Sequence, residues 1–208
     1  YPLSGFVVYN KSQLSMKDCT FSGHIKSTSN ASVDISGFIS SMSGESSFKF
    51  DRCAFTGGIE ILAGWRAGAF VSTNTSTLVA DCEMNFCEMS GSISQENGSE
   101  RVGGFIGSPN TDKSSYIMKG CLMNGTCKRW KSNQEHVWIT QENCIIMGCG
   151  TWKTMGSNTS TTNCYLTPTT ELTVNNMSGF NMASSESLSS GALCYSLNGD
   201  QSSIGFYQ

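Results

Sequence analysis

The chain has 208 residues, of which only 14% are charged, and its formal net charge is −3. We expect no nucleic-acid partner, because phosphate binding requires clustered Lys and Arg, and the longest basic cluster is Lys128, Arg129 and Lys131. No stretch approaches the roughly 18 to 20 apolar residues of a membrane span. The chain begins at Tyr1 without an initiating Met or a leader, which predicts a mature or excised piece of a longer protein.

One sequence unit recurs four times along the chain, and each copy has a Gly-Phe-type start and a later Cys. The starts contain Phe6, Phe38, Phe70 and Phe105, which are spaced by 32, 32 and 35 residues. We align the Cys positions 19, 53, 82 and 121, which are spaced by 34, 29 and 39 residues. Two degraded copies follow around Cys144 and Cys164.

The apolar residues within each copy form short runs with a period of two, such as Phe48-Lys49-Phe50, broken by Gly, Ser and Asn. Such runs predict short strands and turns. A unit of about 32 residues cannot bury its own apolar face, but stacked units can. We therefore predict an all-β fold, a β-solenoid (parallel β-helix) of about 5–6 coils over residues 1–166.

In such a stack, equivalent residues lie about 4.8 Å apart. We expect two structural rows inside it. One is a stack of aromatic rings formed by Phe6, Phe38, Phe70 and Phe105. The other is a row of small, polarisable side chains formed by Cys19, Cys53, Cys82, Cys121, Cys144 and Cys164.

The ten cysteines allow more than one interpretation. They could be free thiols, with positions 87, 127 and 149 in a second row. Alternatively, 82 with 87, 121 with 127, and 144 with 149 could form small-loop disulfides. A zinc site is not expected, because no Cys-x-x-Cys occurs and neither His lies near a Cys pair. The sequence predicts no metal or other cofactor.

The unit Gly103-Gly104-Phe105-Ile106-Gly107, followed by Cys-x-x-x-Gly, closely resembles the GLUG motif repeat. The segments around Asn143-Cys144 and Asn163-Cys164 are similar to the second half of that motif, although Phe replaces the usual Leu and Asp often replaces Asn. The resemblance covers residues 5–125 well and 138–166 weakly. It implies an accessory β-solenoid module of a large exported bacterial protein, such as an adhesin or a surface protease.

The C-terminal part, residues 167–208, is expected to be a cap and linker. Residues 183–197 carry a helix signal, in which Ser184 or Ser185 is the N-cap and apolar residues follow at 188, 192, 193 and 197. Residues 190–208 resemble a linker segment of large surface proteins from gut-type anaerobic bacteria. That resemblance implies that a further module follows.

The four Trp residues fall outside the repeated positions, and three of them lie where the repeat decays. Exposed aromatic rings can stack on sugar faces or anchor a protein partner, and they can also fill a wider coil. Trp65, Trp130, Trp138 and Trp152 are therefore candidate ligand-binding residues.

These patterns favour a non-enzymatic module on the bacterial cell surface, outside the cell. It would act as a spacer, or as a binding surface for a host or dietary glycan or a surface protein. One alternative is a structural subunit that self-associates end to end into an extracellular fibre. The third is a polysaccharide-active β-helix enzyme, which we rank last because each Cys and Asp near a turn already follows the repeat.

Overall fold

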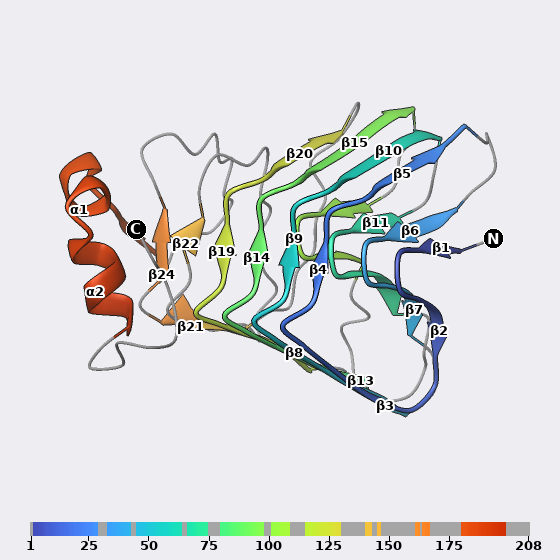
Figure 1. Ribbon diagram of the computed structural model, residues 1–208, viewed down its shortest axis with the longest axis horizontal. Helices are drawn as coiled ribbons and strands as arrows, with labels where there is room; N and C mark the ends of the chain where they lie inside the picture. Colours follow the sequence, from blue (N-terminus) through green and yellow to red (C-terminus); the bar gives the residue numbers. More distant parts are fainter. Residues whose placement is uncertain are drawn as a thin grey trace.

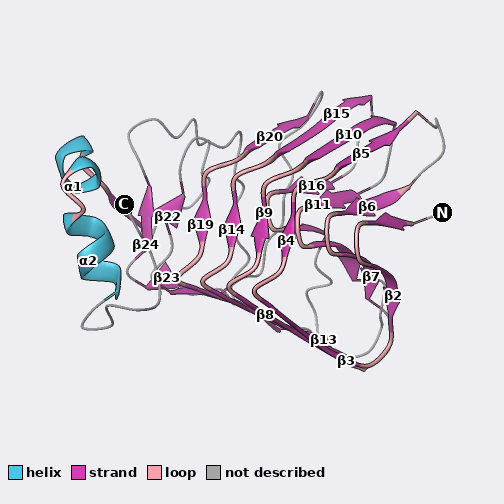
Figure 2. Cartoon of the chain, in the orientation of Figure 1, coloured by secondary structure: helices cyan, strands magenta, loops and turns pink. Residues whose placement is uncertain are grey.

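The computed structural model describes residues 2–28, 33–42, 45–63, 66–74, 80–97, 101–108, 115–129, 140–142, 145–146, 161–162, 164–166 and 180–198. Short strands dominate this part of the chain, and two short helices lie near its C-terminal end (Figure 2). All strand pairs of the described residues are parallel, so the prediction of an all-β fold with parallel strands is confirmed.

The described strands form five sheets, which we number in the order in which the chain first enters them. Sheet 1 contains β1 (Leu3–Ser4), β6 (Asp34–Ser36), β11 (Arg66–Gly68) and β16 (Arg101–Gly103). Sheet 2 contains β2 (Val7–Asn10), β7 (Ile39–Met42), β12 (Val71–Asn74) and β17 (Ile106–Ser108). Sheet 3 contains β3 (Gln13–Lys17), β8 (Ser46–Asp51), β13 (Ala80–Asn85), β18 (Ser115–Lys119), β21 (Thr140–Glu142) and β23 (Thr161–Thr162).

The remaining two sheets follow sheet 3 along the chain. Sheet 4 contains β4 (Thr20–Phe21), β9 (Ala54–Phe55), β14 (Glu88–Met89), β19 (Leu122–Met123), β22 (Ile145–Ile146), β24 (Cys164–Leu166) and β25 (Phe180–Met182). Sheet 5 contains β5 (His24–Ser27), β10 (Gly58–Ala63), β15 (Ser92–Asn97) and β20 (Thr126–Arg129).

Each repeat contributes one strand to each of these sheets, and we call the five strands of one repeat a layer. Strands β1–β5 form the first layer, β6–β10 the second, β11–β15 the third and β16–β20 the fourth. In every sheet a strand pairs with the equivalent strands of the layers before and after it. Figure 1 shows these layers side by side, with the N-terminus at one end and the helices at the other.

A stack of four Phe rings runs through the centre of the core. Phe38 and Phe70 stack with ring centroids 4.7 Å apart, and Phe70 stacks on Phe105 at 5.2 Å. Phe6 stacks on Phe38 at 5.0 Å, but its side chain is 48% exposed because no described layer lies beneath it. Phe50 adds an edge-to-face contact with Phe70 at 5.3 Å, which joins the stack to sheet 3.

Other rows of equivalent apolar residues complete the core. Ile25, Ile59 and Ile93 are paired in register in sheet 5, and the last two are fully buried. Space is tight at Gly37, where an added Cβ would lie 2.5 Å from the Phe55 ring of the same layer and 2.8 Å from the Ala69 carbonyl oxygen of the next layer. A side chain there would force neighbouring layers apart.

The C-terminal segment has two short helices where the sequence predicts one. Helix α1 (Ser185–Ser189) begins at the predicted N-cap Ser184, whose side chain accepts a hydrogen bond from the Ser187 backbone N–H. The helical conformation is interrupted at Gly191, which has a φ of +75°, and it resumes in α2 (Ala192–Asn198). Three buried side chains hold this segment near Leu122 of the fourth layer; they are Ala183, Leu193 and Leu197.

Candidate functional site: a row of thiols and two polar grooves

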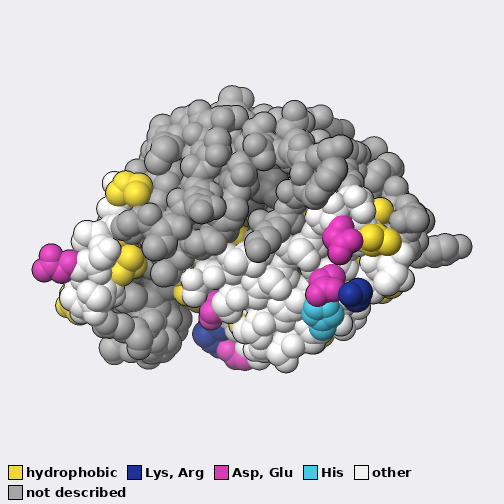
Figure 3. Space-filling model, turned by 90° about the horizontal axis from the view of Figure 1, so that it is seen from above, with side chains coloured by type: hydrophobic (Ala, Val, Ile, Leu, Met, Phe, Trp, Pro, Cys, Tyr) yellow, Lys and Arg dark blue, Asp and Glu magenta, His cyan; other side chains and the backbone are white. Residues whose placement is uncertain are grey.

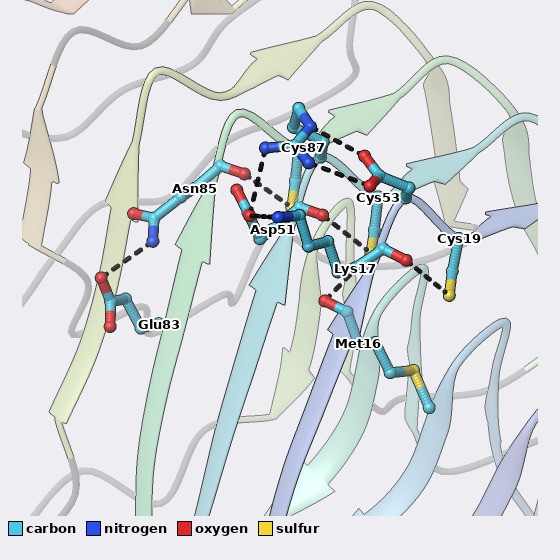
Figure 4. Close-up of polar contacts among 10 residues, drawn as sticks. Met16, Lys17, Cys19, Asp51, Cys53, Glu83, Asn85 and Cys87 are labelled. Atoms are coloured by element: carbon cyan, nitrogen blue, oxygen red, sulfur yellow. Dashed lines mark hydrogen bonds and ion pairs between the residues drawn. The ribbon is translucent and has the colours of Figure 1, made fainter. Parts of the chain in front are cut away.

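A row of cysteines lies at the corner between sheet 3 and sheet 4, one in each of the first four layers. It consists of Cys19, Cys53, Cys87 and Cys121, each 34 residues after the one before. Backbone hydrogen bonds of 2.9 to 3.0 Å link the layers at this corner, from Ala54, Glu88 and Leu122 N–H to the carbonyls of the first three cysteines. Figure 4 shows the first three thiols following one another from layer to layer.

The corner has the same backbone conformation in each layer: the residue before each cysteine of the row lies in the left-handed region of φ and ψ. Asp18, Arg52, Phe86 and Gly120 have φ values of 54°, 52°, 52° and 60°. This single left-handed residue turns the chain from sheet 3 into sheet 4 and directs the next side chain inward. The thiols of Cys53, Cys87 and Cys121 are accordingly only 1% exposed, whereas Cys19 at the open end is partly exposed.

The thiols of the row contact backbone carbonyls and one another. The Cys121 Sγ–H donates to the Met84 carbonyl at 3.4 Å, and the Cys53 thiol donates to the Met16 carbonyl at 3.5 Å. Hydrogen bonding with Cys87 and, to a smaller extent, burial raise the pKa of the Cys53 thiol. Hydrogen bonds with Cys121 and Cys53 lower the pKa of the Cys87 thiol.

The predicted thiol row was wrong at Cys82, which the structure replaces by Cys87. Cys82 lies inside β13 and pairs in register with Phe48 and Tyr116, so it occupies an apolar position of sheet 3. It is 2% exposed, and burial raises the pKa of its thiol. The proposed second row was also wrong, because Cys127 pairs in register with Ile93 in sheet 5.

The sequence contained a signal that identifies Cys87. In each of the first four layers the cysteine of the row is followed four residues later by Gly, and these are Gly23, Gly57, Gly91 and Gly125. Cys82 has no such Gly. Its neighbour Asp81 resembles the Asp before Cys19, but that position requires a backbone conformation and no particular residue type.

All five cysteines whose side chains are described are free thiols. This excludes the pairs 82–87 and 121–127 in this structure. Cys144 and Cys149 lie outside the described residues. The backbone of Cys164 lies in β24, where it pairs with Phe180, and its side chain is outside the described part.

A polar groove of about 570 Å³ lies along sheet 3. Lys49 of the second layer pairs with Glu83 of the third, with its Nζ 3.4 Å from a carboxylate oxygen. Within the third layer, the Asn85 side chain donates a hydrogen bond to Glu83 at 2.8 Å. The hydrogen bond from Asn85, with the charge of Lys49, lowers the pKa of Glu83. A carboxylate held ionised in this way is a poor proton donor.

A second groove, of about 270 Å³, lies along sheet 5. Lys26 Nζ lies 3.0 Å from Glu60, and His24 Nε2 lies 3.4 Å from the same carboxylate. The hydrogen bond from Lys26 lowers the pKa of Glu60. Figure 3 shows acidic, basic and histidine side chains gathered on one face of the molecule. In each groove, a lysine and a glutamate of successive layers thus form an ion pair.

The four candidate ligand-binding residues Trp65, Trp130, Trp138 and Trp152 lie outside the described residues. Among the residues that are described, no three His, Cys, Asp or Glu side chains are grouped to hold one metal ion. No helix in this part of the chain has the length and apolar character needed to cross a membrane.

Comparison of the chain with family models, with curated proteins and with solved structures gave no match. The resemblance to GLUG repeats therefore depends on the sequence motifs alone.

Proposed function

We propose that this chain is a parallel β-solenoid, in which each layer is one coil, and that it is a rigid, non-enzymatic spacer module of an exported, adhesin-like bacterial surface protein. The in-register pairing of every layer with its neighbours supports this proposal most directly. In such an array each coil adds about 4.8 Å of length without changing the cross-section.

The character of the outer faces agrees with a spacer. Lys17 and Asp51, Lys49 and Glu83, and Lys26 and Glu60 form ion pairs between successive layers. These outward charges therefore pair between successive coils. The low content of charged residues and the GLUG-like motifs support a place outside the cell.

The alternative is a recognition module, which would bind a host or dietary glycan or a surface protein. The test is a glycan array probed with the purified 208-residue chain, beside a Trp130→Ala/Trp152→Ala variant with an unchanged circular dichroism spectrum. A spacer gives no specific signal with either sample. Specific retention of one glycan by the wild type, lost in the variant, contradicts a passive spacer.

The fibre alternative is tested by sedimentation velocity over a hundredfold range of concentration. Helices α1 and α2 lie at the end of the stack opposite the N-terminus (Figure 1), where they would obstruct head-to-tail stacking of identical chains. We expect no open-ended polymers. A sedimentation coefficient that grows continuously with concentration would favour the fibre.

A further inference from the structure

The first layer is less buried than the layers behind it, because among the described residues it has a neighbouring layer on one side only. Its inward residues Val7, Met16 and Phe21 are partly buried, whereas their register equivalents in the second layer are at most 1% exposed. Leu3 and Tyr9 of the first layer are exposed. Less apolar area is therefore removed from water by this layer than by an inner one, so its local unfolding costs less free energy.

The first and second layers have opposite formal charges. Residues 2–28 contain three Lys and one Asp, so the first layer carries +2. Residues 33–63 contain one Lys, one Arg, two Asp and two Glu, so the second layer carries −2. Residues 66–97, which form the third layer, contain one Arg, one Asp and three Glu, so they carry −3. Net charge thus attracts the first layer to the second, but it repels the second layer from the third.

The attraction between the first two layers is made by specific contacts at the corner between sheets 3 and 4. Arg52 of the second layer donates to both carboxylate oxygens of Asp18 in the first, at 2.7 and 2.9 Å. A two-pronged bond of this kind is among the stronger surface ion pairs. Arg52 also donates to Asp51 at 3.2 Å, and Lys17 Nζ of the first layer lies 3.9 Å from Asp51 (Figure 4). Two cations and two carboxylates therefore alternate across this boundary.

A second group of contacts joins the same two layers in sheet 5. Glu60 of the second layer faces two residues of the first, with Lys26 Nζ at 3.0 Å and His24 Nε2 at 3.4 Å. Glu96 of the third layer adds a further negative charge near Lys26. The charged contacts of the first layer thus cross to the second layer on two separate sheets.

Acid acts in opposite directions on the first two boundaries of the stack. Hydrogen bonds from Arg52 and Lys26 lower the pKa values of Asp18 and Glu60 in the folded protein. Their contribution to stability is therefore complete above the unfolded pKa values of about 3.9 and 4.3, and it is lost as pH falls through the folded pKa values. With the carboxylates protonated, both the first and the second layer are positive, so their attraction becomes repulsion. Between the second and third layers, acid instead removes the repulsion of two negative layers.

We propose that the first layer is a detachable coil, which opposite charge fastens to the second layer at neutral pH and which acid releases while the other layers stay stacked. The release needs no ligand, because the carboxylates that fasten the coil are themselves the groups that bind protons. It uncovers the edge of the second layer, where Phe38 and Ile39 are fully buried in the closed stack. This device depends on the stacking of layers alone, whether or not the module is a spacer.

Amide hydrogen exchange distinguishes this release from a general loosening, because equivalent N–H groups report on the two boundaries. The reporters of the first boundary donate to carbonyls of the first layer at 2.9 Å; they are the N–H groups of Ala54, Thr56 and Gly58. The reporters of the second boundary donate to carbonyls of the second layer at 3.0 Å; they are the N–H groups of Glu88, Ser90 and Ser92. From about pH 7 to about pH 3, the protection factors of the first set should fall about tenfold more than those of the second. These factors are measured by NMR and corrected for the intrinsic exchange rate at each pH.

Substitutions that remove the charge at neutral pH should reproduce the effect of acid. Asp18→Asn/Glu60→Gln should lower protection at the first boundary about fivefold at pH 7 and should show a smaller further loss in acid. Glu83→Gln is the matched control, because Glu83 pairs with Lys49 across the second boundary, and it should leave the first boundary as protected as in the wild type.

Two results overturn the detachable coil. One is an equal fall of protection at both boundaries in acid, and the other is a double variant that exchanges like the wild type at pH 7. The comparison of the two boundaries in the wild type needs no substitution, so it decides alone if a variant fails to fold.

Discussion

The residue before each thiol of the row has a left-handed backbone in all four layers, although only one of the four is Gly. This conformation costs a non-Gly residue about 1–2 kcal/mol. Hydrogen bonds between layers offset the cost: the backbone N–H groups of Asp18, Arg52 and Phe86 each donate to a carbonyl of the next layer at 2.8 to 2.9 Å. Arg52 also donates to Asp18 at 2.7 Å, which ties two corners together.

Gly120→Ala should lower the free energy of unfolding by roughly 2 kcal/mol or more, measured by urea denaturation. The alanine would keep the positive φ of Gly120, and its Cβ would lie 2.6 Å from the Phe86 ring. In a Phe86→Ala background the steric part disappears, so the same substitution should cost less. Equal costs in both backgrounds would show that the ring is not involved.

Asp34→Asn should stabilise the protein at neutral pH by about 1 kcal/mol. Asp34 is half-buried, its Oδ1 has no hydrogen-bond partner in the described part, and burial raises its pKa despite the opposing charge of Arg66. The pKa of Asp34 is higher in the folded than in the unfolded protein. The contribution of protonated Asp34 to folding stability is therefore complete below about pH 3.9 and is lost as pH rises through the folded pKa.

The wild type should therefore lose stability relative to Asp34→Asn as pH rises from the unfolded pKa through the raised folded pKa. Thermal unfolding of both proteins at several pH values measures this difference. Parallel pH profiles for the two proteins would contradict it.

At the scale of elements, the stack of Phe rings joins successive layers to one another and to sheet 3. Phe70 is fully buried between two stacked rings and has an edge contact with Phe50. Phe6, at the end of the same stack, has one stacked neighbour and is half-exposed. Replacing Phe by Ala at each of these two positions therefore removes the same side chain from a buried and from a half-exposed site.

Phe70→Ala should cost about 3–5 kcal/mol of stability. Phe6→Ala should cost about 1 kcal/mol, because less apolar area leaves water when that ring packs. Urea midpoints with equal m-values measure both effects. Similar losses at the two positions would mean that the first layer is buried in solution.

The elements were predictable to different degrees from the sequence. The period-two runs and the repeated Gly-Phe starts predict parallel stacked strands, and Ser184 is predicted as the helix N-cap. Cys82 was misassigned because Asp81-Cys82 resembles Asp18-Cys19 locally, whereas the corner depends on backbone conformation. The break at Gly191 was missed because a short apolar pattern continues through it.

At the scale of the whole molecule, the period of 34 residues at the thiol corner makes layers interchangeable. Deleting residues 54–87 joins Cys53 to Glu88, and Glu88 pairs in register with Ala54. The joined chain therefore keeps every inward row, with one layer fewer.

This deletion should give a folded protein with a β-rich circular dichroism spectrum and cooperative unfolding. Deleting residues 54–86 instead leaves a one-residue offset, which exchanges inward and outward side chains beyond the join. That variant should unfold at markedly lower urea concentration. Equal midpoints for the two deletions would show that pairing between layers does not fix the register.

The pairing of each layer with its immediate neighbours alone also determines how the protein responds to tension. The hydrogen bonds between parallel strands point from one layer to the next, along the length of the stack. A pull between the two ends would load these bonds from the outermost layer inward, and the layers would peel away one after another. Each event would release a segment of 34 residues, with a gain in contour length of about 110 Å. A module of this kind would lengthen in steps under shear flow and dissipate force before its attachment fails.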